Sequence, residues 1–336
     1  MRALWGLRLR PEDYRRMAAM RTLPELAVFL RAHPRWGRAL EGVDLSAIHR
    51  FELEEHLRRH RLEEHLRVYP YLSREDQELL DFPVLEMELS QIMRYLRLAR
   101  MGRAEEYSFT PPPRLARRSY VNFAALSAAS TYDGLIQAVS GTKFAEVLRG
   151  LKPQLADREF PDFAQMETAL FNVYFRELYA VTVRQRDDGM RRRLLESMGL
   201  QADLMNIAVI LRVKRYYPEM EGLLLSYLLP VHHHLKPPVL QRMYAAQDAS
   251  AVFEVLRGTW YGPYFPADGV SLERTLAQIR YDHSLRGLHE PLPSVVTPLS
   301  FLHLTGVELS NVIHMIECVR YNIPQEEVLS YVVGGE

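Results

Sequence analysis

The sequence predicts an all-α protein made of three similar helical units. Three segments each carry an acidic residue followed three positions later by an amide, and apolar residues recur around each pair at helical spacing. In the last segment Leu309, Val312 and Ile316 occupy positions i, i+3 and i+7, which share one face of an α-helix. The acid–amide pairs are Glu88 with Gln91, Asp203 with Asn206, and Glu308 with Asn311. Because the arrangement occurs three times in one chain, we predict an internal triplication.

Other parts of the repeated unit recur in the same order. Upstream of each pair an acidic residue precedes an apolar one by three positions, and the intervals from this acid to the pair are 34, 36 and 35 residues. These upstream motifs are Glu54 with Leu57, Glu167 with Leu170, and Glu273 with Leu276. Still further upstream a helix is predicted to end in a turn with an aromatic residue, at 141–144 and 258–261 and, with a weaker match, at 32–36. The glycines of the two stronger turns suit helix C-caps.

The first unit is predicted to contain the helix-turn element over 23–40, a charged helix over 51–68 and an acid–amide helix that ends near Met101. Ser73 has the character of an N-cap and is predicted to begin a helix before the acid–amide helix. The run Thr110-Pro-Pro-Pro113 interrupts the helical spacing, so we place the first boundary just before it.

The second unit is predicted to contain a helix that Asp133 opens and that leads into Gly141, a long helix over 162–186, and an acid–amide helix that ends before Pro218. A linker over 229–238, rich in proline and histidine, introduces the third unit. Its last helix is predicted to stop at Pro324 and to be followed by a short helical tail over 325–333. The predicted domains are therefore 1–107, 108–218 and 219–336, each of a common domain size.

Composition limits the classes of function. The 42 basic and 42 acidic residues are interspersed, so no global charge favours a nucleic acid or an anionic membrane as partner. Cys318 is the one cysteine, which excludes an internal disulfide, and its helical context predicts a buried thiol. The apolar run near 223–230 is about half as long as a bilayer crossing, and the N-terminus lacks a signal-peptide core. We therefore expect no transmembrane segment.

Short motifs that resemble ligand sites have simpler explanations. His232, His233 and His234 are consecutive and cannot all face one metal ion. His56 and His60 have the spacing of a metalloprotease helix, but the residue after His56 is a leucine where that motif requires glutamate. The sequence 141–143 lacks the second glycine of a phosphate loop. We expect no catalytic residue, no cofactor, no metal and no directly bound nucleotide.

Two further polar features have more than one interpretation. The arginine groups at 58–59, 117–118 and 191–193 are interpreted as solvated helix surfaces, with contact to an acidic partner as the alternative. The acid–amide pairs are predicted to be structural and to satisfy backbone groups of a neighbouring helix or loop. Their alternative role is to line a central opening and contact an axial partner.

Taken together, these motifs resemble those of the C subunit of the bacterial and archaeal V-type (A-type) ATPases, whose eukaryotic counterpart is the d subunit. The resemblance covers essentially the whole chain. It is carried by the threefold helical unit, by Asp203-x-x-Asn206 with Arg212 and Lys214, by the turns at Gly141 and Gly258, and by Arg8-Leu-Arg10 near the start. The chain departs from the family pattern at Gln91, where asparagine is usual, at the histidine triplet and at Leu4.

The resemblance implies a funnel of three helical domains with pseudo-threefold symmetry. It also implies a cytoplasmic location, peripheral on the membrane, where the protein joins the membrane proteolipid ring to the central-stalk subunits. A protein of this kind performs no chemistry and transmits torque between ion transport, of protons or sodium, and ATP synthesis or hydrolysis. Two alternatives come from other classes. One is a helical-repeat scaffold that binds soluble proteins, although tetratricopeptide units are only about 34 residues long, and the other is an all-α metal-dependent enzyme.

Overall fold

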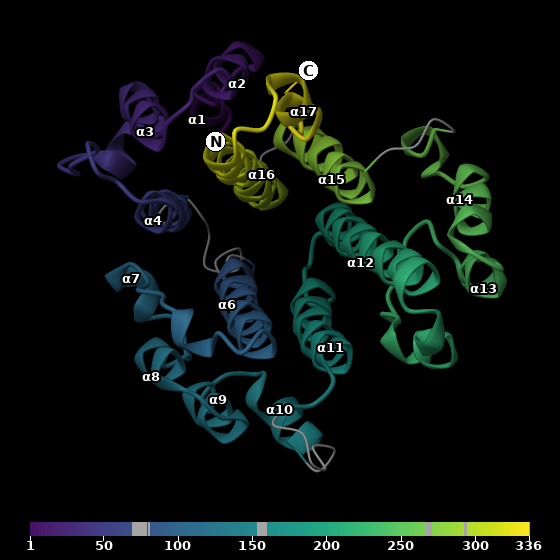
Figure 1. Ribbon diagram of the computed structural model, residues 1–336. Helices are drawn as coiled ribbons and strands as arrows, with labels where there is room; N and C mark the ends of the chain where they lie inside the picture. The colour runs from purple at the N-terminus through teal and green to yellow at the C-terminus, as the bar shows by residue number, and fades with distance from the viewer. Residues whose placement is uncertain (69–78, 80, 153–159, 267–270, 292–293, 336) are drawn as a thin grey trace. The chain divides into compact units, whose positions relative to one another are not determined.

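The computed structural model describes residues 1–68, 79, 81–152, 160–266, 271–291 and 294–335, and every helix or strand assigned in these residues is a helix (Figure 1). The prediction of an all-α protein is confirmed. The described chain divides into two compact units. The first combines Met1–Leu72 with Asp268–Glu336, and the second is Ser73–Ala267.

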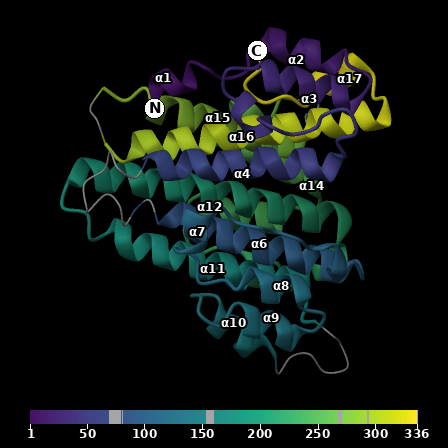
Figure 2. The same cartoon turned by 90° about the vertical axis from the view of Figure 1, so that its left-hand side faces the viewer.

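Three long helices form the body of unit 1, and they run alongside one another (Figure 2). They are α4 (Arg50–Val68), α15 (Leu272–Leu288) and α16 (Val296–Tyr321). Helices α15 and α16 approach closely because Gly287 has no side chain. A Cβ at Gly287 would lie 2.3 Å from Oγ of Ser300. The N-terminal helices of this unit are α1 (Arg2–Trp5), α2 (Pro11–Ala18), α3 (Leu23–Ala32) and the 3₁₀ turn η1 (Gly37–Leu40), and its last helix is α17 (Gln325–Ser330).

The core of unit 1 joins the two ends of the chain. Side chains of α2, α3 and η1 pack with side chains of α4, α16 and α17 in one apolar cluster. Leu26, Trp36, Leu57 and Ile316 are among its fully buried members. Burial of a leucine or isoleucine side chain stabilises a fold by about 1.5 to 3 kcal/mol. The N-terminal helices therefore share one core with α4 and with the helices near the C-terminus.

Unit 2 contains three long helices, α6 (Phe82–Arg100), α11 (Phe163–Thr182) and α12 (Asp188–Tyr216). Helix α11 packs on both α6 and α12. Burial raises the pKa of Glu167 in the first turns of α11, and Arg212 of α12 and Arg97 of α6 oppose that rise. The shorter elements are η3 (Ala104–Glu106), α7 (Pro113–Ala116), α8 (Phe123–Ala128), α9 (Tyr132–Ala138), α10 (Ala145–Leu151), η5 (Pro218–Tyr227), α13 (Pro237–Ala245), α14 (Ala249–Arg257) and η6 (Gly262–Tyr264).

A pair of short helices recurs with the same buried positions. The second helix of each pair begins at an N-cap whose side-chain oxygen accepts a backbone hydrogen bond, at Thr22, Thr131 and Asp248. Four and eight residues later the apolar side chains are fully buried, and the following turn places a fully buried aromatic against the core. These residues are Leu26, Leu30 and Trp36 for α3, Leu135, Val139 and Phe144 for α9, and Val252, Leu256 and Tyr261 for α14.

Several helix boundaries match their predictions and others differ. Helix α4 matches the charged helix, and Asp162 caps α11, which ends at Thr182, four residues before the predicted end. The predicted N-cap Ser73 lies outside the described residues. Gly258 is the C-cap of α14 but has φ −81°, so a left-handed conformation is not the reason for this glycine. Helix α16 ends because Asn322 is left-handed, with φ 51°, before Pro324.

One described helix, α12, is long and apolar enough to cross a bilayer, although its sequence did not lead us to expect such a segment. Of its most apolar window, 61% is buried within the protein. A core helix of a folded domain meets the same criteria of length and composition, so this is weak evidence for a membrane span.

Candidate functional site

All six residues of the acid–amide pairs are buried. The pairs lie on α6, α12 and α16, and each of the six residues is at most 8% exposed. Burying a carboxylate or an amide is costly unless hydrogen bonds compensate for the lost water. The partners of each pair therefore indicate what the pair holds in place.

Asp203 accepts hydrogen bonds from three consecutive backbone amides. The N–H of His233 reaches Oδ1 at 3.0 Å, and the N–H groups of His234 and Leu235 reach Oδ2 at 2.7 and 3.0 Å. The hydroxyl of Tyr261, in the turn after α14, also donates to Oδ2 at 2.8 Å. One carboxylate thus holds an irregular backbone segment and the end of a short helix against α12.

Asn206 holds the chain just before the histidine segment. Its side-chain oxygen accepts the N–H of Leu229 at 2.8 Å, and its side-chain nitrogen donates to the carbonyl of Leu229 at 3.1 Å. Gly199, one turn before Asp203, permits this close approach, because a Cβ there would lie 2.8 Å from Cβ of His233. The segment predicted as a linker is therefore bound to α12 both at its start and in its histidine stretch.

Glu308 makes equivalent contacts with the beginning of the chain. The N–H of Leu9 donates to Oε2 at 3.2 Å. The indole N–H of Trp36 and the guanidinium of Arg35 donate to Oε1 at 2.8 and 3.0 Å. Trp36 follows α3 as Tyr261 follows α14, so the same kind of aromatic turn donates to both acids.

Asn311 contacts the backbone as Asn206 does. Its side-chain nitrogen donates to the carbonyl of Val333 at 2.9 Å, and its side-chain oxygen accepts the N–H of Val333 at 3.2 Å. The same nitrogen lies 3.2 Å from the hydroxyl of Tyr14 on α2. The pair on α16 therefore fastens both the N-terminal segment and the tail that follows α17.

The pair on α6 has fewer contacts. Oε1 of Glu88 accepts the hydroxyl of Ser119 at 2.8 Å and the N–H of Tyr120 at 2.7 Å. Oε1 of Gln91 accepts the hydroxyl of Tyr107 at 3.2 Å instead of bracketing a backbone residue. The aromatic of the corresponding turn is Phe144, which has no hydrogen-bond donor on its side chain.

The three acids share one geometry. Each accepts backbone hydrogen bonds from a segment that leads into a pair of short helices. For Glu88 and Asp203 this segment follows about 30 residues later in the chain, whereas for Glu308 it is the N-terminal segment, 299 residues away. In each segment a buried apolar residue lies two positions before the first short helix. These residues are Leu9 before α2, Val121 before α8 and Leu235 before α13.

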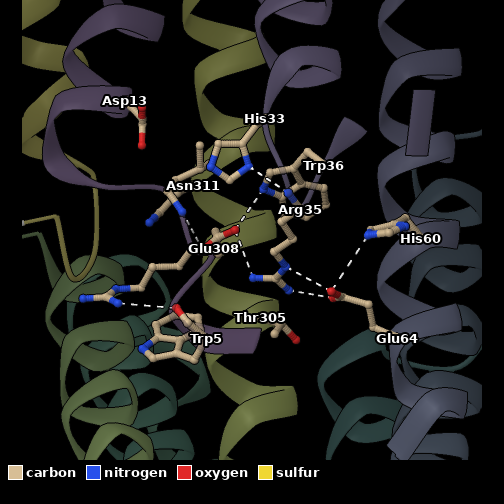
Figure 3. A network of polar contacts seen from close by, with 12 residues as sticks. Trp5, Asp13, His33, Arg35, Trp36, His60, Glu64, Thr305, Glu308 and Asn311 are labelled. Carbon is tan, nitrogen blue, oxygen red and sulfur yellow. Dashed lines mark hydrogen bonds and ion pairs between the residues drawn. The ribbon is translucent and has the colours of Figure 1, made fainter. Parts of the chain in front are cut away.

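Arg35 is the centre of a buried charge cluster in unit 1 (Figure 3). Its guanidinium donates to Glu64 of α4 through Nε at 3.1 Å and Nη2 at 2.7 Å, and to Glu308 of α16 through Nη1 at 3.0 Å. The side chains of Arg35 and Glu308 are each 3% exposed. One guanidinium therefore connects two helices through charge-assisted hydrogen bonds in a site closed to water.

The cluster holds two acidic groups and one permanent cation. Burial raises the pKa of Glu308 to about 7, although Arg35, the Trp36 indole and the Leu9 amide each lower it. Burial alone would lower the pKa of Arg35, but the attraction of Glu308 and Glu64 outweighs it and raises that pKa. Burial lowers the pKa of His60, whose Nε2 lies 3.8 Å from Oε1 of Glu64. His60 is thus neutral at pH 7, and Arg35 supplies the countercharge.

We expect the contribution of Glu308 to stability to decrease as the pH rises from about 4.5 to about 7. Its folded-state pKa lies above the ordinary value of 4.5, so the folded chain binds the proton more tightly than the unfolded chain between these values. The full effect is at most about 3 kcal/mol. Urea unfolding of the wild type and Glu308→Gln at pH 5 and pH 8 measures it. The free energy of unfolding of the wild type, relative to that of the variant, should be higher at pH 5 than at pH 8. An equal difference at both pH values would contradict this expectation.

The other motifs singled out in the sequence have structural contacts. The ring of His234 stacks on Trp260, with centroids 4.2 Å apart. Arg58 pairs with Glu54 at 2.6 Å, and Arg118 pairs with Asp81 at 2.8 Å. Within the described residues no three His, Cys, Asp or Glu side chains are grouped so that they could hold a metal ion.

Cys318 is buried on α16, which confirms the prediction of a buried thiol. Its Sγ lies 3.3 Å from Nε2 of His314. Burial, with Glu327 and Glu317 nearby, raises the pKa of the thiol, so the thiolate that a nucleophile needs is disfavoured.

Sequence reasoning missed Arg35, Glu64 and the backbone of Leu9. A signal existed for the first two. Arg35 immediately precedes the aromatic of the helix-turn motif, and Glu64 lies ten residues after Glu54 in the charged helix. No residue type marks the N–H of Leu9, because every residue except proline carries the same donor.

Comparison with known proteins identifies the family of the chain. The family described as ATP synthase (C/AC39) subunit matches residues 1–331. The chain belongs to this family. The resemblance to the C subunit of the V-type (A-type) ATPases is therefore confirmed.

Two curated relatives are each named as the C subunit of an A-type ATP synthase. The protein of Methanosphaera stadtmanae is 22% identical over 60% of this chain and 54% of its own length. The protein of Archaeoglobus fulgidus is 22% identical over 58% of this chain and 55% of its own length. The chain thus spans about half the length of the curated relatives that it matches.

Proposed function

We propose that this member of the C/AC39 family is a non-catalytic coupling component of a V/A-type rotary ATPase. It would act as a socket between the central-stalk subunits and the membrane proteolipid ring, on the cytoplasmic side, and transmit torque for proton or sodium transport. The observation that carries this proposal is the family match over residues 1–331, and the recurrence of one buried contact supports the threefold architecture that goes with it. Three times an acid on a long helix fixes the backbone that leads into a pair of short helices.

The recurrence supports an internal triplication, with the repeats at 1–107, 108–218 and 219–336 proposed from the sequence. Each long helix holds the short helices of the following repeat, and the last helix holds those of the first. Such a cyclic order suits a pseudo-threefold funnel around a shaft. In this proposal the acid–amide pairs are structural rather than axial contacts, because all six residues are buried and each accepts at least one hydrogen bond from another group of the protein.

A coupling component must resist twisting, and the buried hydrogen bonds support that requirement. A segment such as 229–235 has no regular backbone pairing of its own, so it would flex if it were not fixed to α12. Asp203 and Asn206 fix it through bonds to Leu229, His233, His234 and Leu235. Satisfied buried polar networks of this kind favour one rigid arrangement.

Affinity capture from native membranes tests the proposal. Membranes of cells that carry a tagged copy of the chain are solubilised in mild detergent, and the captured proteins are identified at low and high salt. We expect proteolipid and central-stalk subunits together, with the salt dependence measuring the electrostatic part of docking. A tagged chain carrying Asp203→Ala, which disrupts one of the three contacts, serves as the matched variant and should recover less of both partners. Capture of soluble proteins alone would contradict the proposal and favour a general helical scaffold.

A further inference from the structure

A pocket beside Glu88 in unit 2 carries the same charged positions as the Arg35 cluster. It has a volume of about 670 Å³, and its walls include the apolar side chains of Phe82, Leu85 and Val181. The charged side chains that line it are Asp81, Glu88, Arg117, Arg118, Lys143 and Glu177. Glu88 occupies on α6 the place that Glu308 occupies on α16, as the acid of the acid–amide pair.

Two other charged positions correspond in the same way. Helices α4 and α11 each carry a second acid ten residues after the acid of the upstream motif, which is Glu54 in α4 and Glu167 in α11. In the aromatic turn that belongs with each helix, a basic residue directly precedes the aromatic residue. The corresponding residues are Glu64 and Glu177 on α4 and α11, and Arg35 and Lys143 before Trp36 and Phe144. The pocket therefore has two acids and one base at the places that correspond to Glu308, Glu64 and Arg35. It differs from the cluster in that Asp81, Arg117 and Arg118 line it as well, and Arg118 is paired with Asp81.

The two sites differ in what fills the space between the acids. In unit 1 the guanidinium of Arg35 contacts both carboxylates and is 3% exposed. In unit 2 the ammonium of Lys143 lies 3.5 Å from Glu177, and its side chain is 66% exposed. The exposed lysine lines a pocket together with Glu88 and Glu177, the acids that correspond to Glu308 and Glu64.

Glu88 is consequently a buried acid without a salt bridge among the described residues. Its side chain is buried, and burial raises its pKa, opposed by hydrogen bonds from Tyr120, Ser119 and Val121 but not by a basic side chain. The hydrogen bonds from Ser119 and Tyr120 both end on Oε1. For Glu308, by comparison, one of the donors is a guanidinium.

We propose that this pocket binds the guanidinium of an arginine from a partner protein, in the place between Glu88 and Glu177 that Arg35 takes between Glu308 and Glu64. A guanidinium fits better than an ammonium because its planar fork contacts two carboxylates at once. The apolar walls suit the methylene stem of an arginine. Lys143, at 66% exposure, turns toward solvent when the arginine enters. The proposal does not depend on the rotary assembly.

The test uses the full chain and acetyl-arginine amide as probe, with acetyl-citrulline amide as its neutral counterpart of the same shape. Ligand-observed NMR titration measures the affinity for the wild type and for Glu88→Gln, Glu177→Gln and Glu146→Gln. Glu88→Gln keeps an acceptor for Ser119 and Tyr120, so we expect it to retain the fold, and a melting curve checks this. Glu146 is exposed on α10 outside the pocket lining and is the matched control.

We expect saturable binding of the arginine probe and about tenfold weaker binding to Glu88→Gln and Glu177→Gln, with Glu146→Gln unchanged. Binding of the citrulline compound with equal affinity would overturn the proposal, because the affinity would then not depend on the positive charge. Affinity that is unchanged in both pocket variants, or no saturable binding to the wild type, would overturn it as well. None of these outcomes bears on capture of the chain with ATPase subunits, so failure here is distinguishable from failure of the proposed function.

Discussion

Replacing Arg35 with methionine should destabilise unit 1 by about 3 to 5 kcal/mol. The methionine fills most of the volume but removes the cation that Glu64 and Glu308 share. Two acidic side chains then remain buried with neutral His60 beside them, and a buried acid without a countercharge is among the most costly defects in a fold. Urea unfolding followed by circular dichroism at pH 8 measures the loss.

Arg38→Met is the matched control, because Arg38 lies on η1, three residues from Arg35, and is outside the buried cluster. It should change the free energy of unfolding by no more than about 0.5 kcal/mol. Adding Glu64→Gln and Glu308→Gln to Arg35→Met should restore much of the lost stability, since no unpaired charge remains in the site. A loss below about 1 kcal/mol for Arg35→Met alone would mean that water or rearrangement compensates the two carboxylates.

Replacing Asp203 with alanine should destabilise unit 2 by about 4 kcal/mol or more. The change removes the acceptor of three backbone N–H groups and of the Tyr261 hydroxyl at a fully buried position. Each buried donor left without an acceptor costs about 1 to 3 kcal/mol. Asp203→Asn should lose less stability than Asp203→Ala, because the side-chain oxygen of asparagine still accepts hydrogen bonds. It should still be less stable than the wild type, because the side-chain nitrogen then faces other donors. Urea unfolding of the three proteins measures the order.

Local release of the histidine segment provides a second measurement for Asp203. Limited proteolysis of Asp203→Ala should cleave within 229–236 faster than in the wild type, because the segment loses three of its contacts with α12. Asp133→Ala is the matched control. Asp133 is exposed and pairs with Lys152 on the surface, so its loss should cost no more than about 1 kcal/mol. Equal cleavage of the wild type and Asp203→Ala would show that packing alone holds the segment.

The long helices were predictable from sequence because each carries an apolar stripe at helical spacing that is visible within one turn or two. The charged helix α4 and the start of α11 at Asp162 were predicted for this reason. The end of α11 and the conformation of Gly258 were not, since helix ends depend on what packs against the last turn. At Gly141, for example, a Cβ would lie 3.3 Å from the carbonyl oxygen of Tyr120, a contact that only the folded chain creates.

The acids of the candidate site could be predicted from the sequence, but the groups that donate hydrogen bonds to them could not. Glu88, Asp203 and Glu308 stand out because an acid interrupts an apolar helix at the same place three times. The donors that reach them come from loops whose sequences differ, with Ser119 in one, histidines in another and Leu9 in the third. Every residue except proline carries the same backbone N–H group, so the sequence of a loop does not indicate which N–H group an acid will bind.

The sequence by itself determined the all-α class, the membership of the repeated motifs in one family and the six polar residues of the three acid–amide helices. The helical class and the six residues follow from periodicity and order, and the family follows from the resemblance of the motifs to a known family. Only the tertiary structure decided that Glu308 holds a segment 299 residues away, that Arg35 contacts two carboxylates and that Lys143 lines a pocket with Glu88 and Glu177. The physical reason is that a buried charge is satisfied by whatever donors packing brings within about 3 Å, and packing joins residues without regard to their distance in sequence.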